Sequence, residues 1–225
     1  MTRSRVSRRT GWAALTAATL FAPLSARVLR DPGPLSADAA LHRWSLEHRP
    51  PVAEAVARAV TATGTGIVPY ALLVIAGLYV GRTGRERART VALLVLCLGA
   101  GQALRYATMT ALARPRPSVG DWATHASGWS FPSGHAATAA MTAGLVIAAL
   151  LLRGGSRRVP RRTVVTLIGL WAAAVGLTRV LLGVHWFTDV VGGWLFATAW
   201  VCCLACVYAR LAHAPRPQTF SQEAS

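Results

Sequence analysis

Three short polar motifs lie in an otherwise apolar sequence, and their side chains are suited to handling a phosphate group. The motifs are Arg-Pro-Arg-Pro at 114–117, Pro-Ser-Gly-His at 132–135, and Thr178-Arg179 followed by His185 and Asp189. Charged side chains are costly in apolar surroundings, so they need partners or a function. Together the motifs supply guanidinium, imidazole, hydroxyl and carboxylate groups, but too few carboxylate, imidazole or thiolate ligands for a metal cage.

The third motif contains a candidate nucleophile. His185 and Asp189 are four residues apart where the last apolar segment begins, a spacing that places both on one face of a helix. The carboxylate can hold the imidazole in one tautomer and stabilise the positive charge that it acquires. The other ring nitrogen is then free to attack an electrophile.

The other two motifs supply candidate phosphate ligands. Ser133 and Gly134 lie where a helix is predicted to begin, and the backbone N–H groups at a helix start bind anionic oxygen well. Arg116 and Arg179 carry planar guanidinium groups that match phosphate oxygens. His135 is a second imidazole, which could act as an acid.

The composition indicates a membrane protein with several spans. Of the 225 residues, 53% are hydrophobic and only 14% are charged, which is too apolar for an ordinary soluble domain. The net charge of +16 comes entirely from Arg, and these residues bracket long apolar runs. That distribution argues against a nucleic-acid-binding protein. The four Cys lie inside apolar runs, where we interpret them as small core side chains.

The fold class predicted is all-α, with six transmembrane helices packed as a bundle. The apolar runs cover residues 12–29, 66–81, 90–112, 133–152, 163–182 and 187–209. Each approaches the ~20 residues that a helix needs to cross ~30 Å of hydrocarbon, and the second is the shortest. Helices satisfy their own backbone hydrogen bonds in lipid, so a single membrane-embedded domain over residues 1–225 is expected.

The distribution of Arg predicts the orientation of these spans. Four Arg precede residue 12, four lie in residues 82–89 and five in residues 153–162. Arg-rich connections remain in the cytoplasm, so both termini are expected there, with residues 1–11 as a basic cytoplasmic segment. The helix ends that carry the three motifs then fall together on the extracytoplasmic side of the cell membrane. The sequence therefore predicts one active site on that face.

Three segments allow alternative interpretations. Residues 1–29 also have the basic and apolar regions of a signal peptide, although no small-x-small cleavage site directly follows. Residues 36–60 fit either an amphipathic helix at the outer interface or an ordinary packed loop. Residues 213–225 are rich in polar residues and Pro, and we expect them to be disordered.

The three motifs resemble the signature of the phosphatidic acid phosphatase type 2 superfamily, which comprises integral-membrane lipid phosphate phosphatases. That signature is Lys-x6-Arg-Pro, then Pro-Ser-Gly-His, then Ser-Arg-x5-His-x3-Asp. The second element is intact here, and the third has Thr178 in place of Ser. The first is Arg116-Pro117, preceded by another Arg-Pro. The motifs cover residues 105–190 approximately, and the remainder is similar in its six-helix layout.

The resemblance implies a role for each matching residue. His185 would be the nucleophile and form a phosphohistidine, Asp189 would orient it, and His135 would protonate the leaving oxygen. The matching Arg and Ser residues would bind phosphate, with no metal ion and no other cofactor required.

One position departs from the signature. Met109 lies seven residues before Arg116, where the family has Lys, and Arg105 lies one helical turn earlier on the same side. Arg105 is therefore a candidate substitute cation, with a different geometry toward phosphate.

The sequence therefore predicts a metal-independent membrane phosphatase that acts on a lipid phosphate or diphosphate. Candidate substrates are a polyprenyl diphosphate, phosphatidic acid and phosphatidylglycerol phosphate; the bilayer is the other expected partner, with no nucleic acid. The alternative is a lipid-phosphate-binding or transporter-like protein with weak or no turnover, which Met109 favours and the intact His185–Asp189 pair disfavours. Transfer of the phosphoryl group to an acceptor other than water is a third possibility.

Overall fold

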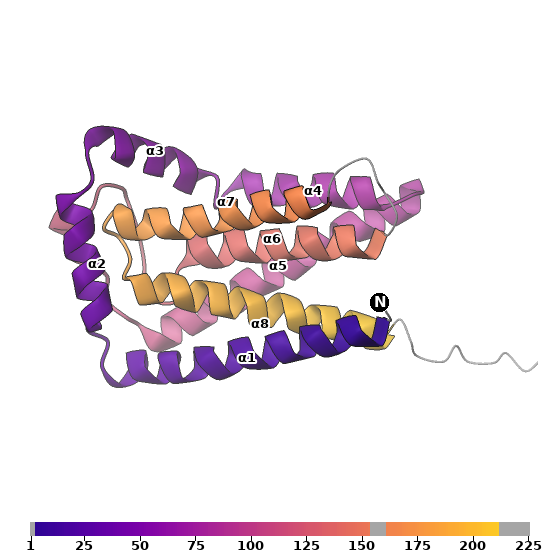
Figure 1. The fold of residues 1–225 in the computed structure, drawn as a ribbon, viewed down its shortest axis with the longest axis horizontal. Helices are drawn as coiled ribbons and strands as arrows, with labels where there is room; N and C mark the ends of the chain where they lie inside the picture. Colours follow the sequence, from indigo (N-terminus) through magenta and orange to yellow (C-terminus); the bar gives the residue numbers. More distant parts are fainter. Residues whose placement is uncertain (1–2, 154–160, 212–225) are drawn as a thin grey trace, which may run out of the picture.

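The computed structural model describes residues 3–153 and 161–211, and within them every regular element is helical. The long helices are α1 (Arg3–Arg30), α5 (Gly84–Leu112), α6 (Gly134–Arg153), α7 (Arg161–Leu181) and α8 (Phe187–Leu211). The short ones are α2 (Ser36–Glu47), α3 (Pro51–Ala62), α4 (Ile67–Val80) and the 3-10 turn η1 (Val119–Asp121). Figure 1 shows the long helices side by side, with the start of α1 and the end of α8 at one end of the bundle. The predicted all-α bundle is confirmed.

Five helices are long and apolar enough to cross a membrane, and the pair α3 and α4 forms a sixth span only if the two are counted together. The axes of these two helices differ by 50°, across a break at residues 63–66. With 14 residues, α4 rises about 21 Å, short of the ~30 Å of a bilayer core. The apolar run over residues 66–81 thus forms α4 as predicted, but it completes a sixth span only together with α3.

The bundle is organised around α6 and α8. Helix α8 packs against α1 on one side and α6 on the other, while α6 also contacts α4, α5 and α7. The core between them contains Leu73, Leu98, Met141 and Phe196, each from a different helix. Many large apolar side chains point outward, including Leu96, Leu167 and Leu170. Outward-facing apolar residues are expected where lipid is the solvent.

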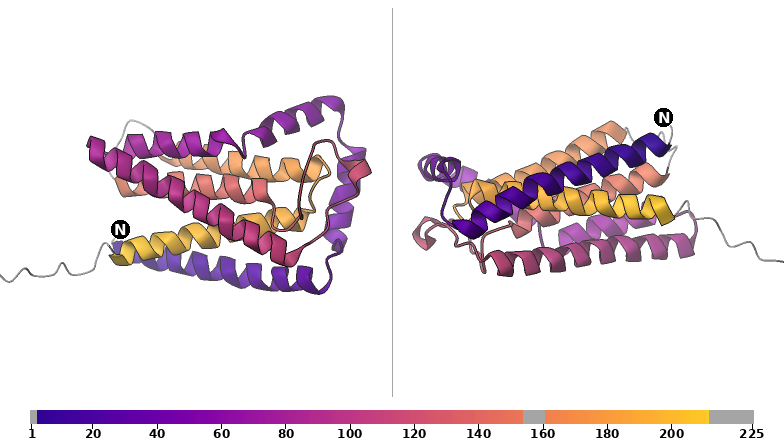
Figure 2. Two further views of the ribbon diagram at one scale, coloured as in Figure 1. Left: turned by 180° about the vertical axis from the view of Figure 1, so that it is seen from behind. Right: turned by 90° about the horizontal axis from the view of Figure 1, so that it is seen from below.

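Helix α2 lies across the end of the bundle opposite the N-terminus, at a steep angle to the long helices (Figures 1 and 2). Its buried positions are polar, namely Asp38, His42 and Ser45, whereas Leu41 and Trp44 are exposed. The segment 36–60 is thus neither a single amphipathic helix nor a loop. It forms α2 and most of α3, and α2 turns its polar face toward the bundle.

The connection between α5 and α6 is fixed against the same end of the bundle. The backbone N–H of Ser130 donates to the carbonyl oxygen of Arg114 at 2.8 Å, and its hydroxyl donates to the carbonyls of Arg114 and Pro115, both at 3.1 Å. The N–H of Ala123 donates to the carbonyl of Leu182, just beyond α7, at 3.0 Å. These bonds hold the double Arg-Pro motif beside the turn between α7 and α8.

The C-terminal segment 213–225 and most of the Arg-rich connection 153–162 lie outside the described residues. The expectations of a disordered tail and of one domain over the whole chain therefore stay predictions.

Candidate active site

The structure brings the starts of α6 and α8 into direct contact. The backbone N–H of Ser133 donates to the carbonyl oxygen of Asp189 at 3.0 Å. A Cβ at Gly193 would lie only 2.9 Å from the carbonyl oxygen of Ser133, so the approach of the two elements requires glycine there. The second and third motifs are joined at this contact.

His185 and Asp189 form a buried pair, but the prediction that they share one face of a helix was wrong: α8 begins at Phe187, so His185 lies in the turn before it and Asp189 in its first turn. The Nδ1 of His185 lies 3.3 Å from Oδ2 of Asp189, which also accepts the backbone N–H of Trp186 at 2.9 Å. The side chains of His185 and Asp189 are 3% and 0% exposed, respectively. Because a carboxylate only accepts hydrogen bonds, Nδ1 carries the proton and Nε2 has the lone pair.

Arg116 approaches that lone pair directly. Its Nη1 lies 2.9 Å from Nε2 of His185 and donates to the carbonyl of Val184 at 2.8 Å. The other guanidinium nitrogens donate to the carbonyls of Ser127, Gly128 and Trp129. Burial, followed by the charges of Arg116 and Arg179, holds the pKa of His185 well below its usual range. The imidazole is therefore neutral at neutral pH, as a nucleophile must be.

Arg179 and Ser133 carry buried polar atoms that are not satisfied. Arg179 is 2% exposed, and its Nη1 donates to the hydroxyl of Thr61 at 3.1 Å. Its Nε and the hydroxyl of Ser133 are buried and have no hydrogen-bond partner within the described residues. Unsatisfied buried polar groups are costly and need an explanation. An anionic ligand that accepts from both would satisfy them.

The hydroxyl of Thr178, which replaces the Ser of the signature, bonds the carbonyl of Val175 within α7 at 2.7 Å. This hydroxyl therefore bonds within α7 and, among the described residues, forms no hydrogen bond with the other predicted site residues.

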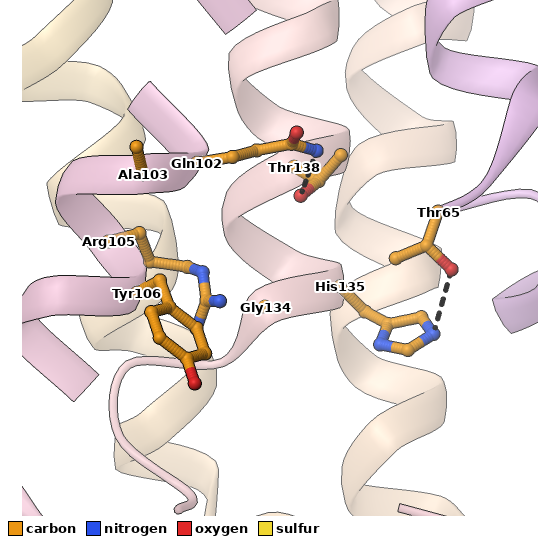
Figure 3. Close-up of a pocket in the computed structure, with 8 residues that line it drawn as sticks. All are labelled: Thr65, Gln102, Ala103, Arg105, Tyr106, Gly134, His135 and Thr138. Atoms are coloured by element: carbon orange, nitrogen blue, oxygen red, sulfur yellow. Dashed lines mark hydrogen bonds between the residues drawn. The ribbon is translucent and has the colours of Figure 1, made fainter. Parts of the chain in front are cut away.

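A cavity of about 430 Å³ lies between α5, α6 and the break at residues 63–66. Figure 3 shows Arg105 and Gln102 on one side of it and His135 and Thr65 on the other. The guanidinium carbon of Arg105 would be 3.5 Å from a Cβ at Gly134, so the side chain reaches the start of α6. Its Nη1 lies 3.4 Å from the carbonyl of Pro132. Arg105 therefore lies beside the Pro-Ser-Gly-His motif, and its role as a substitute cation stays a prediction.

His135 lies in the first turn of α6 and lines the same cavity as Arg105. Its Nε2 lies 3.3 Å from the hydroxyl of Thr65. All eight predicted site residues thus gather at one end of the bundle: Arg105, Arg116, Ser133, Gly134, His135, Arg179, His185 and Asp189.

Arg114 belongs to the first motif, but its role was not predicted from the sequence. Its side chain is fully buried, and it donates from Nη1 to Oδ1 of Asp189 at 2.6 Å and from Nη2 to Oδ2 of Asp38 at 2.8 Å. It also donates to the hydroxyl of Thr188 at 2.8 Å and to the carbonyls of Pro32 and Gly33 at 3.2 and 3.0 Å. One guanidinium thereby joins the loop after α1, helix α2 and the start of α8.

Asp38 completes this network from α2. Its Oδ1 accepts the backbone N–H of Thr188 at 2.8 Å, and its Oδ2 accepts the hydroxyl of the same residue at 2.7 Å. The carboxylate is fully buried. A repeated Arg-Pro pair and a carboxylate in a mostly apolar chain were signals for such a pairing, but nothing in the sequence joined them.

We expect Asp38→Ala to destabilise the protein by about 3 kcal/mol, because it removes one of the two buried carboxylates that pair with Arg114 and the acceptor of both the backbone N–H and the hydroxyl of Thr188. Thermal unfolding in detergent measures the loss. Asp31→Ala is the matched control, since Asp31 pairs with Arg27 at an exposed position. Equal stability of the two variants would contradict the structural role of Asp38.

Comparisons with known proteins agree with the motifs and the fold. Residues 90–212, more than half of the chain, match the PAP2 superfamily. Phosphatidylglycerophosphatase B of Bacillus subtilis (strain 168) is 29% identical over 160 residues, covering 70% of this chain and 76% of that protein. The crystal structure of the first transmembrane PAP2 type phosphatidylglycerolphosphate phosphatase from Bacillus subtilis superposes with a TM-score of 0.75 and 25% identity, over 91% of this chain and all of that one. Aquifex aeolicus LpxE shares the fold, with a TM-score of 0.59 and 23% identity over 77% of this chain and 96% of that one. The protein is a multi-pass membrane protein, and it belongs to the PAP2 superfamily.

Proposed function

We propose that the protein is a lipid phosphate phosphatase that works through a phosphohistidine at His185. The observation that carries the proposal is the environment of this ring, which is buried and neutral, with Asp189 at Nδ1 and Arg116 at Nε2. A carboxylate fixes the tautomer and stabilises the cation that forms on attack. A guanidinium at the attacking nitrogen can bind the phosphoryl oxygens there.

In the first step, Nε2 of His185 attacks phosphorus, and the bond from phosphorus to the lipid oxygen breaks. His135 donates a proton to that oxygen, so the lipid leaves as a neutral alcohol or, from a diphosphate, as a protonated phosphate. Arg116, Arg179 and Arg105 stabilise the charge on the transferred group, because each is fixed beside the site before the substrate binds.

In the second step, water attacks phosphorus of the phosphohistidine and gives a proton to His135. The bond from phosphorus to Nε2 breaks, its electron pair returns to the His185 ring, and inorganic phosphate leaves. Each histidine ends in its starting protonation state, so the cycle closes without another reactant.

We propose that the reaction requires no metal ion. Three guanidinium groups supply the positive charge that metal ions provide in other phosphatases. Residues 3–153 and 161–211 also contain no group of three or more His, Cys, Asp or Glu side chains suited to holding a metal.

The substrate class is tested by phosphate release from a panel of lipid phosphates in detergent, comprising phosphatidylglycerol phosphate, phosphatidic acid and a polyprenyl diphosphate. The names of the Bacillus subtilis relatives favour phosphatidylglycerol phosphate.

We expect phosphate release to persist in a chelator, to be inhibited by vanadate, and to be lost in His185→Ala. His48→Ala, at an exposed position of the same residue type, should retain activity. Wild-type protein that binds these lipids without releasing phosphate would support the binding or transporter-like alternative.

We propose that the site faces the extracytoplasmic side, because the start of α5, which carries Arg85, Arg87 and Arg89, lies at the other end of the bundle (Figure 1). In a background without the four native Cys, Ser118→Cys lies beside the site and Arg85→Cys at the opposite end, both at exposed positions. In intact spheroplasts, an impermeant thiol reagent should label the first and spare the second. The reverse pattern would overturn the orientation and the outer-leaflet substrate.

Arg105 is tested by replacement and rescue. Arg105→Ala should lower kcat roughly 10²- to 10³-fold, or about 2–4 kcal/mol, through loss of a charge-assisted phosphate contact. Met109→Lys should partly restore activity in that variant, because Sδ of Met109 lies only 3.4 Å from Nη1 of Arg105. Met109→Leu in the same background is the control and should restore nothing. Near-wild-type turnover of folded Arg105→Ala would show that Arg105 only packs at the helix end.

A further inference from the structure

We infer that Thr65 is the positioning residue for His135. Its hydroxyl accepts a hydrogen bond from the Nε2–H group of His135, so that Nδ1 of the same ring exchanges a proton with the lipid oxygen. The inference rests on the proposed role of His135 as the acid. Thr65 lies outside residues 90–212, which match the family, so neither the motifs nor the family comparison assigns it a role.

Thr65 lies in the break between α3 and α4, at residues 63–66. Irregular backbone within a span persists only where it is buried in protein or lines a cavity, because exposed backbone groups are costly in lipid. Here the break is held closely against α7, since a Cβ at Gly64 would lie only 2.2 Å from Cγ1 of Val175. The break therefore has a defined place in the fold, and it brings Thr65 to the start of α6.

At that place Thr65 meets one specific atom of the site. Its Oγ1 lies 3.3 Å from Nε2 of His135, and both side chains line the 430 Å³ cavity. Figure 3 shows Nε2 turned toward Thr65, while the other ring nitrogen faces away from it. Arg105 lies across the cavity, so the cavity joins the acid to one of the proposed phosphate ligands.

The direction of this hydrogen bond follows from the chemistry of the acid. A neutral imidazole that gave up its only N–H proton would become an anion, which is inaccessible near neutral pH. The acid is therefore the imidazolium, which gives the Nδ1 proton to the lipid oxygen as the phosphorus–oxygen bond breaks and keeps the hydrogen on Nε2. An acceptor at Nε2 stabilises both forms of the ring, and the Thr65 hydroxyl is an acceptor at hydrogen-bond distance.

Thr63 is a control that distinguishes the proposed role of Thr65 from a hydrogen bond that only holds two helices together. Thr63 lies in the same break, and its hydroxyl accepts the indole N–H of Trp171 on α7 at 2.8 Å. Hydrogen bonds of this kind hold transmembrane helices together. Thr63→Val and Thr65→Val each remove one such acceptor, but only the second acceptor contacts a residue of the site.

The test compares kcat/KM across alkyl and aryl phosphates that the wild-type protein turns over, ordered by the acidity of the leaving alcohol. This ratio reports the steps up to departure of the alcohol and not the later hydrolysis of the phosphohistidine, which is the same for every substrate. A general acid matters most for a basic leaving group such as an alkyl alcohol and little for an acidic phenol. Thr65→Val should therefore slow alkyl phosphates roughly 10- to 100-fold and nitrophenyl phosphates less than about threefold. Thr65→Ser, which keeps the hydroxyl, should restore the wild-type pattern. Thr63→Val should leave the dependence on the leaving group unchanged.

Equal slowing of all substrates by Thr65→Val, or none, would overturn the inference, as would the same leaving-group dependence in Thr63→Val. If Thr65→Val does not fold, Thr65→Ala removes the same hydroxyl with less bulk and is judged by the same criterion. Failure of the proposed function differs visibly from these outcomes, because the wild-type protein would then release no phosphate from any member of the series.

Discussion

The site depends on one buried guanidinium between two carboxylates. Arg114 lies between Asp38 of α2 and Asp189 of α8, with each side chain fully buried. Removing charge from water is expensive, so a cluster of this kind persists only when its geometry and hydrogen bonds are nearly complete. Arg114 meets that condition with two carboxylates, the Thr188 hydroxyl and two backbone carbonyls. The loop after α1, helix α2 and the start of α8 are thereby fixed together.

The charge of this network accounts for the arrangement of the rest of the site. Two carboxylates and one guanidinium leave a net negative charge beside His185, on the side of Nδ1. Arg116 and Arg179 lie near the other side of the ring and keep it neutral in the free protein. A phosphoryl group bound at Nε2 would lie beside these two guanidinium groups. The cation formed on the ring would be stabilised by the carboxylates on the side of Nδ1. Such preorganised charge stabilises a transition state without rearrangement.

Much of this site could be predicted from the sequence, because its reactive residues occur in short motifs at the ends of long apolar runs. The pairing of His185 with Asp189 was predicted from their separation in sequence, although His185 lies in the turn before α8 and not on the helix, and the three motifs were predicted to lie at one end of the spans. Asp38 and Thr65 could not be predicted in this way, because each acts through a contact with a residue distant in sequence. The 50° bend between α3 and α4 was not predicted either, because the angle between two helices is set by their packing against the rest of the bundle.

The central claim is that the Arg114-bound carboxylate of Asp189 holds Nδ1 of His185 and leaves Nε2 as the nucleophile. The most direct test is to quench the protein during turnover at alkaline pH, where phosphohistidine survives, and to identify the modified residue and ring nitrogen by mass spectrometry with isomer standards. The account predicts phosphate on His185 and on its Nε2 atom. Phosphate on Nδ1, on His135, or on no histidine while inorganic phosphate is being released would contradict it.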